Sequence, residues 1–123
     1  MPLEIRPTPN ETHTLRLSLA GELTTTTATD LDQFIGQNLA PTTKTLILDL
    51  EELHFIASAG LRVLVKSRKL MQSRDGKLLI THPSPQVQKV FKIAKAVPLN
   101  EVFQDADELD AYLKKQQSQV ENN

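Results

Sequence analysis

The sequence predicts an α/β domain in which helices pack on a mixed β-sheet of about four to five strands. Two observations lead to this prediction. After two short alternating segments, strand patterns and helical patterns follow one another, which is typical of strand–helix–strand units. The run Thr45–Leu50 is almost continuously apolar, as in a strand buried on both faces of a sheet. We expect one domain with about four helices over residues 1–123, because this length supports a single core.

The first part of the chain is expected to form an antiparallel hairpin. Residues 3–6 and 14–19 alternate apolar and polar side chains, as half-exposed strands do, and Thr8-Pro9-Asn10-Glu11 between them is a turn signal. Residues 24–27 are four threonines that offer N-caps for a first helix, which Pro41 ends. The apolar positions of this helix follow helical spacing: Ala28, Leu31, Ile35 and Leu39.

A second helix is predicted from Ser58 to about Asp75, directly after the strand Thr45–Leu50. Its apolar side comprises Leu61, Leu64, Val65 and Met71. A further strand follows at residues 77–81. Because a strand–helix–strand crossover returns to the same sheet, these elements form a parallel pair, and Ser58 is expected at the carboxyl end of the first strand.

A third helix begins at Ser84, as the cap, with Pro85 at the first helical position. It ends before Pro98, and its core face is predicted to be Val87, Val90, Phe91 and Ala94.

The last part of the chain is predicted to add a short strand and a fourth helix. Val102-Phe103 is the strand, and Asp105 with Glu108 resembles a capping box for a helix containing Leu109 and Leu113. The expected core therefore covers about residues 3–113. Residues 114–123 form a polar tail that we expect to fray from about Gln116.

The composition excludes several functional classes. A net charge of −1 lacks the basic footprint of a nucleic-acid binder, and the absence of cysteine excludes disulfides, thiol catalysis and cysteine metal sites. No apolar run approaches the roughly 20 residues that span a bilayer, and residues 1–4 do not begin a signal peptide. The three histidines lack metal-ligand spacing. We expect a cytoplasmic protein without a cofactor or bound metal.

Ser58 is the most informative residue, because it lies between small residues where a strand gives way to a helix. Its hydroxyl is placed to act as the helix N-cap. The N–H groups and the dipole of a helix N-terminus also favour negative charge. A phosphate on Ser58 would add close to two negative charges at this point, so the same residue is a candidate switch.

Residues 46–70 resemble the anti-sigma-factor antagonists of the STAS family. In that family, Asp-Ser-Ser/Ala-Gly-Leu opens a helix after a strand, and residues 57–61 read Ala-Ser-Ala-Gly-Leu. Residues 17–23 look like the family's Gly-Glu-Leu-Asp turn, and the resemblance extends over most of residues 3–113. Ala57 and Thr24 stand where many relatives carry an acidic residue.

The resemblance implies partner switching. The unphosphorylated protein would bind an anti-sigma factor that is itself a serine kinase, which would then phosphorylate Ser58, and a serine phosphatase would reverse the modification. No catalytic residue is implied. The implied partner-binding residues lie in the two loops and the start of the helix, and we expect the loops to be neighbours: Glu22, Thr24, Ala57, Ser58, Ala59, Gly60 and Arg62.

Other interpretations remain open at this stage. The chain can be a STAS module that binds its partner constitutively, as a scaffold or a subunit of a transport complex, or a generic ligand-binding α/β domain. Residues 56–60 match half of the Gly-x-Ser-x-Gly nucleophile elbow of hydrolases, but Ile56 stands in the place of its first glycine. Gly60 is compatible with close packing of the helix on the sheet or with the close approach of a partner. Arg62 lies on the same helix face as Ser58 and can stabilise a phosphate there, pair with an acidic partner, or be solvated. The oligomeric state is not predicted.

Overall fold

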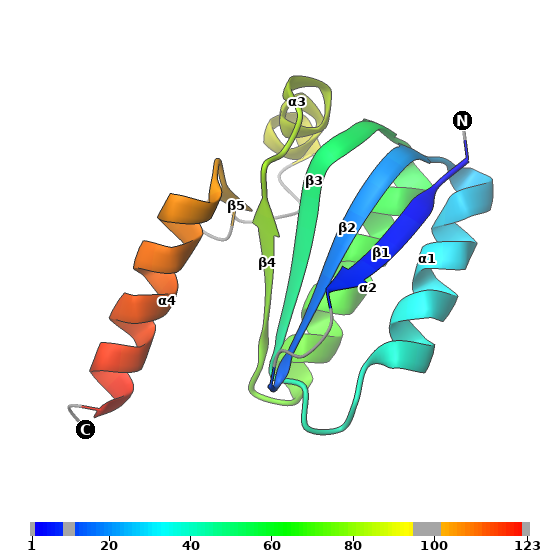
Figure 1. The fold of residues 1–123 in the computed structure, drawn as a ribbon. Helices are drawn as coiled ribbons and strands as arrows, with labels where there is room; N and C mark the ends of the chain where they lie inside the picture. The colour runs from blue at the N-terminus through cyan, green and yellow to red at the C-terminus, as the bar shows by residue number, and fades with distance from the viewer. Residues whose placement is uncertain (1, 9–11, 95–101, 122–123) are drawn as a thin grey trace.

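The computed structural model describes residues 2–8, 12–94 and 102–121. Its strands are β1 (Glu4–Thr8), β2 (Thr14–Leu23), β3 (Thr45–Ile56), β4 (Lys77–Thr81) and β5 (Val102–Phe103), and its helices are α1 (Thr25–Asn38), α2 (Ser58–Ser73), α3 (Pro85–Ala94) and α4 (Ala106–Glu121). Within this part of the chain, five strands form one sheet in the order β1-β2-β3-β4-β5 (Figure 1). β1 is antiparallel to β2, and all later neighbours are parallel. The predicted mixed sheet with about four helices is confirmed.

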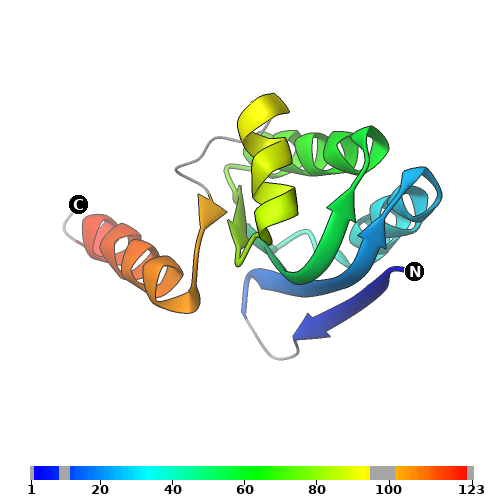
Figure 2. The same ribbon diagram turned by 90° about the horizontal axis from the view of Figure 1, so that it is seen from above.

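Two hydrophobic clusters lie on opposite faces of the sheet. α1 and α2 cover one face, where they bury alternate residues of the central strands such as Leu17, Leu46 and Leu48. On the other face, Ile47 and Leu79 pack against residues of β5 and α4. Figure 2 shows α1 and α2 together on one side and α4 displaced to the other. β3 is thus buried on both faces over its first half, as its apolar run predicts.

β3 is longer than the sequence predicts. The apolar run ends at Leu50, but the strand continues to Ile56 because β2 continues beside it, with Ala20 opposite Glu52 and Leu23 opposite Ile56. In this extension Leu53 and Ile56 are buried, while the other residues from Glu51 to Phe55 are exposed. The pattern changes because the strand leaves the doubly covered part of the sheet.

The hairpin of β1 and β2 is confirmed, although the predicted turn at residues 9–11 lies outside the described residues. Gly21, near the end of β2, has φ +104, and the register with β3 shifts between Gly21 and Glu22. A Cβ atom on Gly21 would lie 2.1 Å from the carbonyl oxygen of Pro2. Glycine is therefore required here both for its backbone conformation and for the close approach of the chain at Pro2.

The third helix differs from its prediction at its end. Ser84 accepts a bond from the N–H of Val87 at 3.4 Å, as expected of a cap, and Val87 and Phe91 are buried. Ala94, predicted to face the core, is exposed, because it is the last residue of α3 and the helix leaves the sheet there. Pro98 lies outside the described residues.

The fourth helix begins as predicted and continues further. The N–H of Glu108 donates to the carboxylate of Asp105 at 2.9 Å, but the Glu108 carboxylate accepts from the N–H of Gln104 rather than from that of Asp105. The helical backbone runs to Glu121, and it includes Gln116, from which the sequence predicts fraying. Most residues from Lys114 to Glu121 are good helix formers, which favours the continuation of the helix beyond Leu113.

A pair of glycine substitutions tests the packing at the end of β2. Gly21→Ala should lower the free energy of unfolding by about 1–3 kcal/mol, because alanine at positive φ is strained and its Cβ would overlap the backbone at Pro2. The control is Gly36→Ala at an exposed position in the last turn of α1, where a Cβ meets nothing within 4 Å and should stabilise the protein by about 0.5–1 kcal/mol. Urea unfolding measures the stability of both variants. Equal changes in the free energy of unfolding would contradict the close packing described at Gly21.

Candidate functional site

The turns that follow β2 and β3 lie side by side at one end of the sheet. Leu23 is opposite Ile56 in the parallel register, and the N–H of Ala57 donates to the carbonyl oxygen of Leu23 at 2.8 Å. This bond joins the end of one strand directly to the start of the next loop. The expectation that the loop after Gly21 lies near Ser58 is thereby confirmed.

The Thr24 side chain caps the first turn of α1. Its hydroxyl oxygen accepts a bond from the N–H of Thr27 at 3.2 Å, and the Thr27 hydroxyl accepts from the N–H of Thr24 at 2.8 Å. The Thr27 hydroxyl also donates to the carbonyl oxygen of Glu22 at 2.9 Å. This reciprocal capping box fixes the junction of β2 and α1, where Glu22 and Thr24 are half-buried, beside the start of α2.

Ser58 does not cap α2, so that prediction is wrong. The N-cap is Ala57, whose backbone is extended and whose carbonyl oxygen accepts the first helical bond, from the N–H of Leu61 at 3.0 Å. The extension of β3 to Ile56 leaves Ala57 as the only residue between strand and helix. Ser58 is consequently the first residue of α2, and its side chain is exposed.

The start of α2 is chemically suited to an anion. The first N–H groups of a helix have no partner within the helix, and the helix dipole adds partial positive charge at the same end. Ala57 provides no side chain that would occupy these donors. The exposed Ser58 hydroxyl therefore lies in a field that stabilises a negatively charged group placed there.

Gly60 lies beneath this surface and is buried. A Cβ atom at this position would lie 2.6 Å from Cγ of Leu23 and 3.1 Å from Cγ1 of Ile56. Of its two open interpretations, close packing of α2 against the ends of β2 and β3 is the one that the geometry supports. Gly60 supports the site from below, and a partner would not reach it directly.

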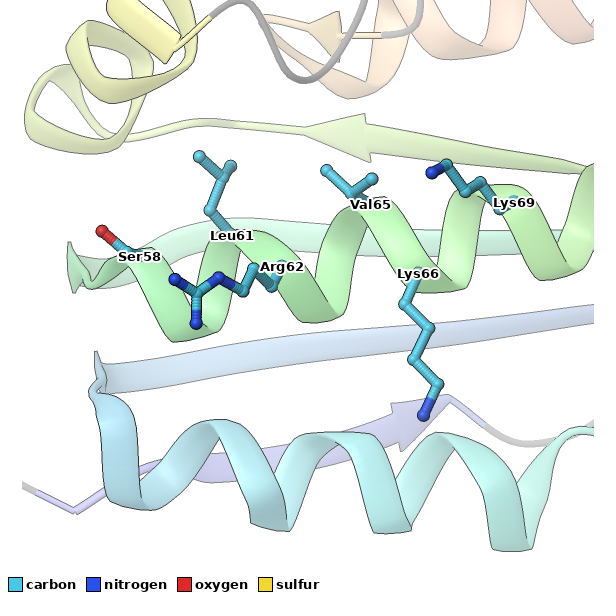
Figure 3. A pocket seen from close by; sticks show the side chains of 6 residues that line it. All are labelled: Ser58, Leu61, Arg62, Val65, Lys66 and Lys69. Atoms are coloured by element: carbon cyan, nitrogen blue, oxygen red, sulfur yellow. The ribbon is translucent and has the colours of Figure 1, made fainter.

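A shallow groove of about 530 Å³ begins at Ser58 and follows the outer side of α2 (Figure 3). Its apolar floor comprises Leu61 and Val65, both half-buried, so Val65 lies in the groove instead of the predicted core face. Three exposed cations complete the lining: Arg62, Lys66 and Lys69.

Two of these cations extend from α2 in different directions. Figure 3 shows the Arg62 guanidinium extending along α2 on the side of Ser58, one helical turn away. Lys66 extends toward α1, where its ammonium lies 2.9 Å from the carboxylate of Asp32. The groove therefore combines an apolar floor with basic charge next to the serine.

Sequence reasoning found Ser58 and Arg62 but missed the rest of the groove. Lys66 and Lys69 follow Arg62 at helical spacing, which was the available signal. Phe55, just before the turn, is 48% exposed and is an apolar contact that sequence reasoning also missed. The described residues that line the groove include no histidine, so the serine–histidine pair of a nucleophile elbow is not formed there.

The STAS domain model matches residues 6–109 of this sequence. The chain belongs to the STAS domain family. One relative, BtrV of Bordetella bronchiseptica, carries the name of an anti-sigma factor antagonist and is 30% identical over 76 residues. These residues are 62% of this chain and 66% of BtrV, so the match spans just under two thirds of that relative.

Solved structures show the same fold at lower identity. The phosphorylated form of SpoIIAA from Bacillus superposes with a TM-score of 0.71 at 19% identity, covering 89% of this chain and 99% of SpoIIAA. A sulfate transporter family protein from Wolinella succinogenes gives a TM-score of 0.70 at 20% identity, covering 83% of this chain and 85% of that protein. No helix in the described part of this chain is long and apolar enough to span a membrane.

A threonine pair tests the turn that positions the site. Thr24→Ala should destabilise the protein by about 1 kcal/mol, because it removes the side-chain acceptor at the α1 N-cap. Thr26→Ala, an exposed position in the first turn of the same helix, should be neutral or slightly stabilising. Thermal unfolding followed by circular dichroism compares the two variants, and an equal loss in both would contradict the capping role.

Proposed function

We propose that this protein is a cytoplasmic anti-sigma-factor antagonist that works by partner switching. Its unphosphorylated form binds an anti-sigma factor that is also a serine kinase, and phosphorylation of Ser58 releases it. A serine phosphatase restores the binding form. The observation that carries the proposal is the exposed Ser58 hydroxyl in the first turn of α2, at the end of a basic, apolar-floored groove.

The groove supports a binding role for this surface. Its apolar floor, Leu61 and Val65, provides area that a partner can bury, and Phe55 adds an exposed aromatic ring near the same turn. Arg62 and Lys69 favour an acidic partner segment and would speed its association, while Lys66 already pairs with Asp32. The implied partner-binding set Glu22, Thr24, Ala57, Ser58, Ala59 and Arg62 surrounds the start of this groove, with Gly60 beneath it.

Phosphorylation at Ser58 would change this surface without changing the fold. The serine is exposed and takes no part in capping α2, so a phosphate can be added without breaking a described structural contact. The phosphate would bring between −1.5 and −2 charges to the end of the groove, where Arg62 lies one turn away. It would compete with an acidic partner for the same cations and would have to be desolvated in the interface.

A constitutive STAS binding module is the second candidate. Two observations favour it: Ala57 supplies no carboxylate beside Ser58, and the Thr24 side chain is already used by the α1 cap. As a scaffold or a transport-complex subunit, such a module would use the same groove with no phosphoserine. The fold likeness to a sulfate transporter family protein is compatible with this role.

Substitutions at Ser58 distinguish the two candidates. Ser58→Asp should weaken binding of the cognate anti-sigma factor more than about 100-fold, a loss of about 3 kcal/mol, while Ser58→Ala should bind as the unmodified protein does. The reason is the negative charge placed at the interface.

The matched control is Gln37→Glu, which adds a negative charge at an exposed position in the last turn of α1, outside the groove lining, and should leave binding unchanged. Titration calorimetry with the purified partner measures all three variants. Equal affinity of Ser58→Asp and Ser58→Ala would refute the switch and support the constitutive module.

A further inference from the structure

Asp49, Glu51 and His82 form a cluster apart from the groove. Asp49 follows Ile47 at the two-residue period of a strand, so it lies on the face of the sheet opposite α1 and α2. The parallel register places Asp49 opposite Thr81, and His82 follows directly. One possible ligand atom from each of the three residues lies within 4.8 Å of the others.

The imidazole of His82 lacks a conventional partner. Its Nδ1 atom is buried and is the one buried side-chain polar atom among the described residues that has no hydrogen bond. Oδ1 of Asp49 lies 3.3 Å from this nitrogen. The N–H of Glu51 donates to the same oxygen at 3.1 Å, which fixes the carboxylate toward the ring. An unprotonated ring nitrogen and a carboxylate oxygen facing one another need a cation between them, whereas an Nδ1–H tautomer would donate to that oxygen.

We infer that Asp49, Glu51 and His82 bind a divalent transition-metal cation with the chemistry of Zn²⁺. Two ligand atoms on a tetrahedral zinc, each at about 2.0–2.1 Å, lie about 3.4 Å apart, close to the 3.3 Å between Nδ1 and Oδ1. An imidazole beside carboxylates selects zinc-like ions over Mg²⁺ and Ca²⁺, which prefer oxygen ligands alone. The exposed Glu51 carboxylate would supply the third ligand, leaving the fourth position to solvent.

The cation would add a link between two segments that already meet through backbone pairing and core packing. Asp49 and Glu51 belong to β3, whereas His82 lies just after β4 and its N–H donates to the carbonyl oxygen of Phe103 at 2.9 Å. Binding there would stabilise the folded state, because the three ligands come together only in the fold. The groove along α2 lies on the opposite face, so this site is independent of the proposed switch.

Zinc titration of the full chain tests the inference, with calorimetry and a melting curve as readouts at about pH 7.5, where free imidazole is neutral. The variants are Asp49→Asn and His82→Asn. Asparagine is chosen because His82 has φ +52, a conformation that asparagine tolerates. The matched control is His13→Asn, an exposed histidine with φ +62 just before the start of β2.

The inference predicts one equivalent of Zn²⁺ bound, a raised melting temperature, and a loss of affinity of roughly 10-fold or more in both cluster variants but not in His13→Asn. Excess Mg²⁺ should not compete. A zinc-dependent shift of the His82 ring nitrogens in NMR spectra of the unmodified chain gives the same answer if a variant fails to fold. Absence of binding, or equal binding by His82→Asn, would overturn the site and leave a histidine–carboxylate contact without a metal.

Discussion

The rest of the structure depends on the parallel pairing of β2 and β3 up to Leu23 and Ile56. Because the two strands end together, α1 and α2 begin as neighbours, and the Ala57–Leu23 backbone bond closes the junction at 2.8 Å. Gly60 then allows α2 to lie directly on the ends of both strands. The same contacts that complete the core also present Ser58 at the surface, so the geometry of the site follows from the packing of the sheet.

The residues that hold the backbone of the site differ from the residue that would be modified. The cap of α1 at Thr24 and the packing at Gly60 hold the backbone, while the Ser58 side chain takes part in neither and is exposed. A modification at such a position acts on the partner through charge and desolvation instead of through unfolding. The groove beside it provides the apolar area and the cations on which such a charge would act.

Local sequence patterns predicted the order and type of the elements, because each strand and helix has its own apolar period and punctuation. They placed the end of β3 at Leu50 because burial on both faces ends there, whereas pairing with β2 continues. Because β3 extends to Ile56, the N-cap of α2 is Ala57 instead of the predicted Ser58. The proximity of His82 to Asp49 could not be predicted from spacing, because the parallel register of β3 and β4 creates it.

The central claim is that Ser58 is a phosphorylation switch. The most direct test is intact-mass analysis with site mapping of the protein purified from its own cells, under growth and under stress. The proposal predicts a species heavier by one phosphate, with the modification on Ser58 alone. A protein without phosphate under every condition, or one phosphorylated only at other residues, would contradict the switch and leave a module that binds its partner constitutively.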